Sequence, residues 1–138
     1  IPSRILRKVT ENHPTFNSTA PIDLSGAHLV FYHWKHMNYM PDGRQYLQYK
    51  CSAYLLDQKM TKITHMVNGP LFTGSLADEV IWWTMSQGQK VSTQPACILP
   101  FGGILQKDEL VMPLGVNDAW IGTFRCPVDN IMAFMEPV

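Results

Sequence analysis

Charge is scarce in this sequence. Only 16% of its 138 residues are Asp, Glu, Lys or Arg, and eleven basic residues balance eleven acidic ones. This balance excludes the positive field expected of a protein that binds nucleic acid non-specifically, or of a polybasic membrane anchor. The sequence also has no apolar run of the ~20 residues that span a bilayer. We therefore expect no bulk nucleic-acid binding and no membrane span.

Cysteine is scarce too. Cys51, Cys97 and Cys126 are far apart and form no Cys-x-x-Cys motif. Three cysteines exclude a zinc site with four cysteine ligands, and their spacing is not that of a disulfide framework. We expect buried free thiols, with one disulfide between two of them as the alternative. Asn17 starts an Asn-Ser-Thr acceptor pattern for glycosylation, which would matter only in a secreted protein.

Sequence motifs for catalysis are absent. The sequence has no Gly-x-Ser-x-Gly elbow, no P-loop and no dinucleotide-binding fingerprint. Its adjacent carboxylate pairs are Asp78–Glu79 and Asp108–Glu109. Neighbouring residues on a strand point to opposite faces, so neither pair is placed for acid–base work on one bond. We expect no enzymatic activity and no cofactor.

Three histidines lie close together in the sequence, and imidazole is a common metal ligand. On a regular strand, His28 and His36 would share a face about 26 Å apart while His33 points the other way. The three rings would then not converge on one ion. We expect surface or hydrogen-bonded histidines and no metal site.

Aromatic and apolar residues are plentiful. The chain contains four Trp, five Tyr and six Phe, and 46% of its residues are hydrophobic, which excludes a disordered chain. Its length is that of one compact domain. Ten prolines and nine glycines interrupt the apolar runs at short intervals.

The spacing of these runs predicts short strands, and the polar residues 38–43, with Pro-Asp-Gly at their centre, predict a tight reversal between the first two strands. Residues 46–56 alternate most clearly, with Leu47, Tyr49, Cys51, Ala53 and Leu55 on one face. For residues 80–85 a helix stays open as the alternative, because residues 75–78 resemble a helix start. Eight short strands predict an all-β fold, an antiparallel β-sandwich with the strand count of a jelly roll. We expect them at residues 27–37, 46–56, 60–67, 80–84, 90–99, 103–112, 118–126 and 131–136.

The N-terminal part differs in composition from the rest. Residues 1–24 are polar and contain several prolines, so we expect an extended arm before a single sandwich domain at residues 25–138. The arm has an apolar edge and a basic cluster, which suit contacts with a neighbouring molecule. The expected contact residues are Arg4, Ile5, Arg7, Lys8 and Val9.

The tryptophans are the candidate surface residues. Trp82 and Trp83 would point to opposite faces of a strand. The aromatic residues that exceed the needs of one small core are these two with Trp34, Trp120, Tyr39, Tyr46 and Tyr54. Exposed aromatic rings serve in partner contacts or in sugar stacking. We favour partner contacts, because no cluster of acidic and Asn residues adjoins a tryptophan. So many apolar residues with so few charges also predict a homo-oligomer, which we expect to be a trimer.

These features predict a structural or recognition module that self-associates and packs in a larger protein assembly. Viral capsid proteins, capsid-decoration proteins and attachment-fibre heads have this profile, which would place the protein in a virion or outside the cell. The alternative is a carbohydrate-binding β-sandwich domain with a glycan as ligand. A cupin-like small-barrel enzyme is the third possibility. The residues by themselves do not identify a family.

Overall fold

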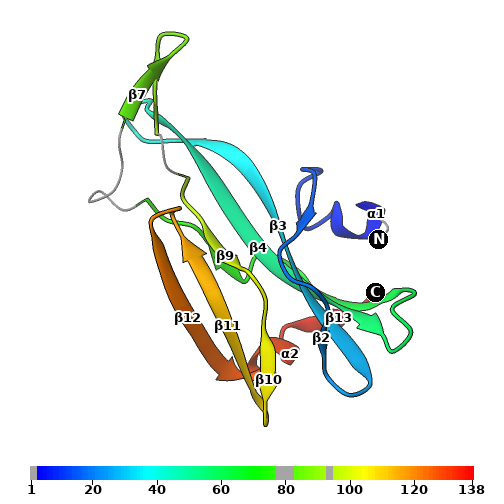
Figure 1. Cartoon of the computed structure of the whole chain (residues 1–138). Helices are drawn as coiled ribbons and strands as arrows, with labels where there is room; N and C mark the ends of the chain where they lie inside the picture. The colour runs from blue at the N-terminus through cyan, green and yellow to red at the C-terminus, as the bar shows by residue number, and fades with distance from the viewer. Residues whose placement is uncertain (1–2, 77–82, 93–94) are drawn as a thin grey trace.

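Two β-sheets make up most of the structure. The computed structural model describes residues 3–76, 83–92 and 95–138 of the chain. Its strands form a nine-stranded sheet A and a four-stranded sheet B (Figure 1). The long strand pairs of both sheets are antiparallel, so the predicted all-β antiparallel class is confirmed.

Sheet A contains β1 (Phe16–Asn17), β2 (Ile22–Asp23), β3 (Ala27–Tyr39), β4 (Gln45–Asp57), β5 (Ile63–Val67), β6 (Phe72–Thr73), β7 (Trp83–Ser86), β8 (Gln89–Ser92) and β13 (Met135–Pro137). Sheet B contains β9 (Ile98–Pro100), β10 (Ile104–Gln106), β11 (Glu109–Val116) and β12 (Trp120–Pro127). The two short helices are α1 (Ser3–Leu6) and α2 (Val128–Met132).

The β3–β4 hairpin is the frame of the molecule. Both strands are 13 residues long and rich in aromatic and apolar residues, which favour the extended chain. The turn between them is closed by the Met40 N–H, which donates to the Arg44 carbonyl oxygen at 2.7 Å. Gly43 adopts a φ of 87° in this turn, a conformation that glycine accepts without strain. The predicted strands and reversal in this region are confirmed.

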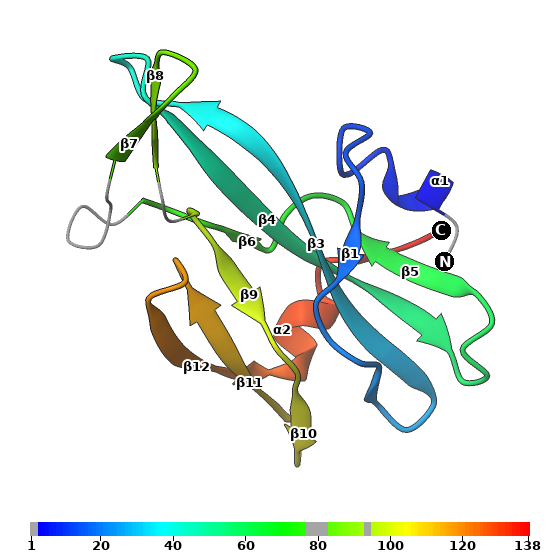
Figure 2. The same cartoon turned by 45° about the horizontal axis from the view of Figure 1, so that its top comes forward.

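The first core lies between the two sheets. Odd-numbered residues of the hairpin, among them Phe31 and Ala53, share a buried cluster with Leu110 and Met112 of β11. Figure 2 shows sheet B on one side of β3 and β4. This packing gives the molecule a sandwich-like form, as expected for sheets that each have an apolar inner face.

The second core lies on the opposite face of the same hairpin. Even-numbered residues, among them Tyr32, Trp34 and Tyr54, cluster there with Ile63 of β5. Leu6, the last residue of α1, covers this cluster and is 2% exposed. Both faces of the central hairpin are therefore buried, which explains why residues 51–56 are buried without alternation.

The N-terminal segment differs from the extended arm that the sequence predicts. It contains α1, β1 and β2, and the last two form hydrogen-bonded pairs with β3. Thr10 is fully buried, and Ile22 belongs to the first core. The segment folds back on its own sheet because the apolar face of β3 and β4 needs a cover that sheet B does not provide.

The prediction of an eight-stranded jelly roll is not confirmed. Sheet B is built from four consecutive strands, and the chain returns to sheet A only at β13. The strand expected at residues 131–136 is also wrong in part, because α2 ends at Met132 and β13 begins at Met135. Val128, Ile131 and Met132 have the spacing of one apolar helix face, and Ile131 fills the first core. Residues 77–82 lie outside the described part, and with them the first half of the segment 80–85 that was left open between helix and strand; the second half, residues 83–85, lies in strand β7.

Candidate protein-contact surface

Sheet B has one face in the first core and one face turned away from it. Even-numbered residues of β11, such as Leu110 and Met112, point into the core. Odd-numbered residues of β11 and β12 point the other way and form the outer face. The cross-strand pairs on this face are Val111 with Arg125, Pro113 with Thr123, and Gly115 with Ile121.

Apolar side chains gather on the outer face. We define the outer apolar patch as Leu99, Phe101, Ile104, Val111, Pro113 and Ile121. The exposed fraction is 84% for Ile121, 64% for Phe101 and 60% for Ile104. The Phe101 ring lies over Gly115, where a larger residue would collide with it. Exposed apolar side chains that adjoin one another in this way mark interaction sites.

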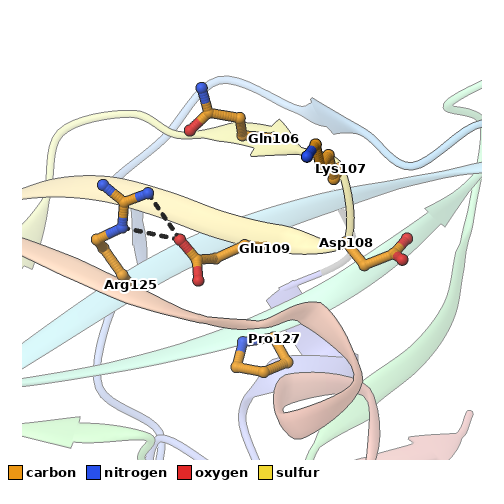
Figure 3. Close-up of a pocket in the computed structure, with 6 residues that line it drawn as sticks. All are labelled: Gln106, Lys107, Asp108, Glu109, Arg125 and Pro127. Atoms are coloured by element: carbon orange, nitrogen blue, oxygen red, sulfur yellow. Dashed lines mark hydrogen bonds and ion pairs between the residues drawn. The ribbon is translucent and has the colours of Figure 1, made fainter.

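A charged groove adjoins the patch at the β10–β11 turn (Figure 3). It measures about 530 Å³ and is lined by Gln106, Lys107, Asp108, Glu109, Arg125 and Pro127. Arg125 Nε and Nη2 each lie 2.8 Å from Glu109 Oε1, while the Asp108 carboxylate points away from this pair. Both partners of the ion pair are largely exposed, so it stabilises the fold by about 1 kcal/mol at most. The Asp108 carboxylate in this turn is exposed, and Glu109, the first residue of β11, is half-buried.

The turn before β12 is held by a buried asparagine. Asn117 and Asp118 have φ values of 53° and 52°, which Asn and Asp tolerate better than most residues. Asn117 Oδ1 accepts a hydrogen bond from the Cys97 N–H, and its Nδ2 donates to the Ser75 carbonyl oxygen, both at 2.9 Å. This network fixes where β12 starts, and it leaves the Asn117 amide engaged with the chain's own backbone.

The four tryptophans do not form one surface. Trp34 is 2% exposed in the second core and stacks on Tyr32, so its expected place in a partner surface is wrong. Trp82 lies outside the described residues, and of Trp83 only the backbone, in β7, is described. Trp120 is 42% exposed at the start of β12. Of the predicted surface tryptophans, Trp120 alone has a described, exposed side chain, and it lies on the inner face of sheet B, opposite the outer apolar patch.

The predicted arm residues contact their own chain. Ile5 and Val9 line a cleft of about 470 Å³ together with Met66 of β5, and Lys8 lies on the same cleft. Arg7 is exposed, and the side chain of Arg4 lies outside the described part. These contacts give the basic cluster a place beside sheet A, and nothing in them points to a neighbouring molecule.

The histidines join a row of rings on sheet A. As predicted, His28 and His36 share one face of β3 and His33 lies on the other. The His33 ring stacks between Phe16 and Tyr49, with ring centroids 5.6 Å from each. Burial lowers the pKa of His33, and the nearby positive charge of Lys35 lowers it further. The His33 ring therefore acts as an aromatic packing group near neutral pH.

Two partners of these histidines were not evident from the sequence. The Ser18 hydroxyl lies 2.8 Å from His33 Nδ1, and the His13 ring stacks on His36 at 5.7 Å. No local pattern signals that residues 13–18 return to β3. Within the described ranges, no group of three or more His, Cys, Asp or Glu residues is placed to hold a metal ion.

The cysteines are free, as predicted. Cys51 and Cys97 are buried, and Cys126 is half-buried. Burial raises the pKa of the Cys51 thiol to about 12 and also raises the pKa of the other two thiols. A nucleophilic cysteine needs the opposite shift, because the thiolate is the reactive form.

Over the parts of the chain that the structure describes, no helix is long and apolar enough to cross a membrane. Comparison of the chain with protein-family models, with curated proteins and with solved structures found no match.

Proposed function

We propose that this protein is a structural or recognition module that works through protein–protein contacts. The outer apolar patch of sheet B carries the proposal. A sheet with one face on a core usually has polar residues on its other face. Ile121, Phe101 and Ile104 break that pattern, although their side chains contribute little to the first core. Their exposure is explained when another protein covers them.

The proposed contacts include copies of the same chain. Apolar patches are costly to keep exposed on a freely diffusing monomer. The net charge of zero provides no long-range repulsion between copies. Self-association within a larger assembly, such as a viral shell or an attachment fibre, would cover the patch permanently. A virion or extracellular location follows from that setting and belongs to the same proposal.

The carbohydrate-binding alternative now has weaker support. A sugar site needs an exposed ring beside free amide and carboxylate groups. Trp120 supplies a ring, but the amide of the nearby Asn117 is engaged with Cys97 and Ser75. The enzyme alternative has no activated cysteine among the three thiols. We therefore place protein contacts first.

The test removes the apolar character of the patch. The double variant Phe101→Ser/Ile121→Ser should lower the association of the protein, measured by light scattering, at unchanged thermal unfolding. Met60→Ser is the matched control, because Met60 is 52% exposed in the β4–β5 turn, away from sheet B. Association that is equal in wild type, double variant and control would contradict the proposal. Binding to a glycan array that depends on Trp120 would favour the carbohydrate alternative.

A further inference from the structure

Strand β12 forms an open edge of sheet B. Figures 1 and 2 both show it as the outermost strand, on the side of β11 away from β9 and β10. Over the described residues it pairs with β11 alone. Its eight residues pair with β11 without a bulge. A long, regular edge of this kind is a template for pairing with another strand.

Pro113 in β11 shows which backbone groups of β12 point to the open edge of sheet B. The Phe101 N–H donates to the Pro113 carbonyl oxygen at 3.1 Å, so this carbonyl points toward β9 and β10. The N–H and C=O groups of one residue in an antiparallel strand point to the same side, so Pro113 makes no backbone hydrogen bond to its partner Thr123. The N–H and C=O groups of Thr123 therefore point to the open edge.

The same two-residue period extends along the strand. The Val128 N–H donates to the Asp108 carbonyl oxygen at 2.8 Å. This bond has the same parity, so the even-numbered residues of β12 are the ones whose backbone groups bond to β11. The odd-numbered residues Ile121, Thr123 and Arg125 then present their backbone groups to the open edge. All three are exposed. Over the described residues, no strand other than β11 pairs with β12, so these groups have no strand partner at the open edge.

We infer that β12 pairs antiparallel with β12 of a second copy of this chain, about a two-fold axis at Thr123. The inference rests on the proposed self-association and adds a contact between copies at the edge of β12, next to the outer face. In this register, Thr123 lies opposite Thr123 of the second copy, and Ile121 lies opposite Arg125. Each residue whose backbone groups point to the open edge then lies opposite such a residue of the second copy and exchanges two hydrogen bonds with it. Sheet B becomes continuous across the two copies.

The side chains on the outer face suit this register. Arg125 is the charged residue at the edge, and its charge is already offset by Glu109 of its own chain at 2.8 Å. Its aliphatic stem can cover Ile121 of the second copy while the guanidinium stays in water. Thr–Thr is a favourable cross-strand pair. The outer apolar patches of the two copies then form one surface.

The inner face suits it as well. Trp120 lies opposite Cys126 of the second copy, which covers a ring that is 42% exposed in one chain. Gly122 lies opposite Phe124 of the second copy, and no atom of its own chain comes within 4 Å of the place where a Cβ would sit. In both inner-face pairs, a bulky ring therefore lies opposite a small residue. No pair brings like charges together.

The ends of β12 limit the pairing to one dimer. Pro127 has no N–H group to continue the ladder at one end. At the other end, the Ala119 N–H is already bonded to the Val116 carbonyl oxygen. A two-fold contact of this kind closes on itself and does not form a filament. The edge geometry thus favours a dimer over the trimer expected from composition.

Amide hydrogen exchange tests the pairing directly on the wild-type protein. Ile121, Thr123 and Arg125 should exchange slowly at high protein concentration and fast at high dilution. Gly122, Phe124 and Cys126 should be protected at both concentrations, because they bond to β11. Fast exchange of the odd-numbered amides in a sample that light scattering shows to be associated would overturn the edge pairing and leave the outer patch as the contact. A trimeric mass would also overturn it.

Substitution of Thr123 supplies the second test. Thr123→Pro removes an edge N–H from each copy and should raise the dimer dissociation constant at least about tenfold. Thr123→Val keeps the N–H and the size of the side chain, and should change that constant by less than about threefold. Equal dissociation constants for the Pro and Val variants would contradict the inference. A wild-type protein that stays monomeric at all concentrations would instead contradict the proposed self-association itself.

Discussion

Replacement of Leu6 tests whether the N-terminal segment belongs to the fold. Its side chain is 2% exposed and packs in the second core, on the face of β3 and β4 away from sheet B. Leu6→Ala removes three carbon atoms, and burial of each stabilises the fold by about 0.8 kcal/mol. The cavity left in a cluster that contains Tyr32 and Trp34 adds to this loss. We expect the free energy of unfolding to fall by about 3 to 4 kcal/mol.

The assay is urea unfolding followed by tryptophan fluorescence, with the slope checked for two-state behaviour. Lys8→Ala is the matched control, because Lys8 is exposed just after α1 and should change the free energy of unfolding by about 0.5 kcal/mol or less. If Leu6→Ala lost no more than this control, the segment would be a detached arm. The second core would then lack the cover assigned to it.

Three further outcomes follow from the packing. Trp34→Ala should lower the free energy of unfolding by about 3 to 5 kcal/mol and Trp120→Ala by about 1 kcal/mol, measured by urea titration; equal losses would contradict their different burial. Gly74→Ala should destabilise the fold by about 2 kcal/mol or more, because a methyl group there would overlap the Ala96 backbone; an unchanged urea midpoint would show that the two segments are less close. Because burial lowers the folded-state pKa of His33, the unfolded chain binds more protons below pH 6.5, and stability should fall from that pH toward the folded pKa. His33→Gln should show a smaller fall over that window in urea midpoints; an identical fall would assign it to other groups.

The sequence was most informative where local pattern and burial agree. The alternation of residues 46–56 correctly predicted which residues of β4 share a face, and the polar residues 38–43 correctly predicted the hairpin. The pattern could not predict that both faces of this hairpin are covered. That cover comes from α1 and sheet B, which are distant in sequence.

The wrong predictions also concern burial by segments that are distant in sequence. Trp34 was expected at a surface because composition cannot tell that a second core would bury it. Residues 1–24 were expected to be extended because their few apolar residues, Leu6 among them, form no periodic run long enough to signal packing. The patch on sheet B does have a signal in the sequence. Val111, Pro113 and Ile121 are apolar and lie between the core residues of the same strands, so both faces of these strands are apolar. Strands of this kind indicate a sheet that is covered on both faces.

The most direct measurement is the molar mass of the wild-type protein by light scattering across the micromolar range, beside Phe101→Ser/Ile121→Ser. The proposed function predicts a mass above that of one chain that rises with concentration, and a loss of association in the double variant. If β12 pairs as inferred, the molar mass of the wild-type protein rises to twice that of one chain and no further. A wild-type protein that remains a single chain throughout would contradict the claim that copies of the chain contact one another through sheet B.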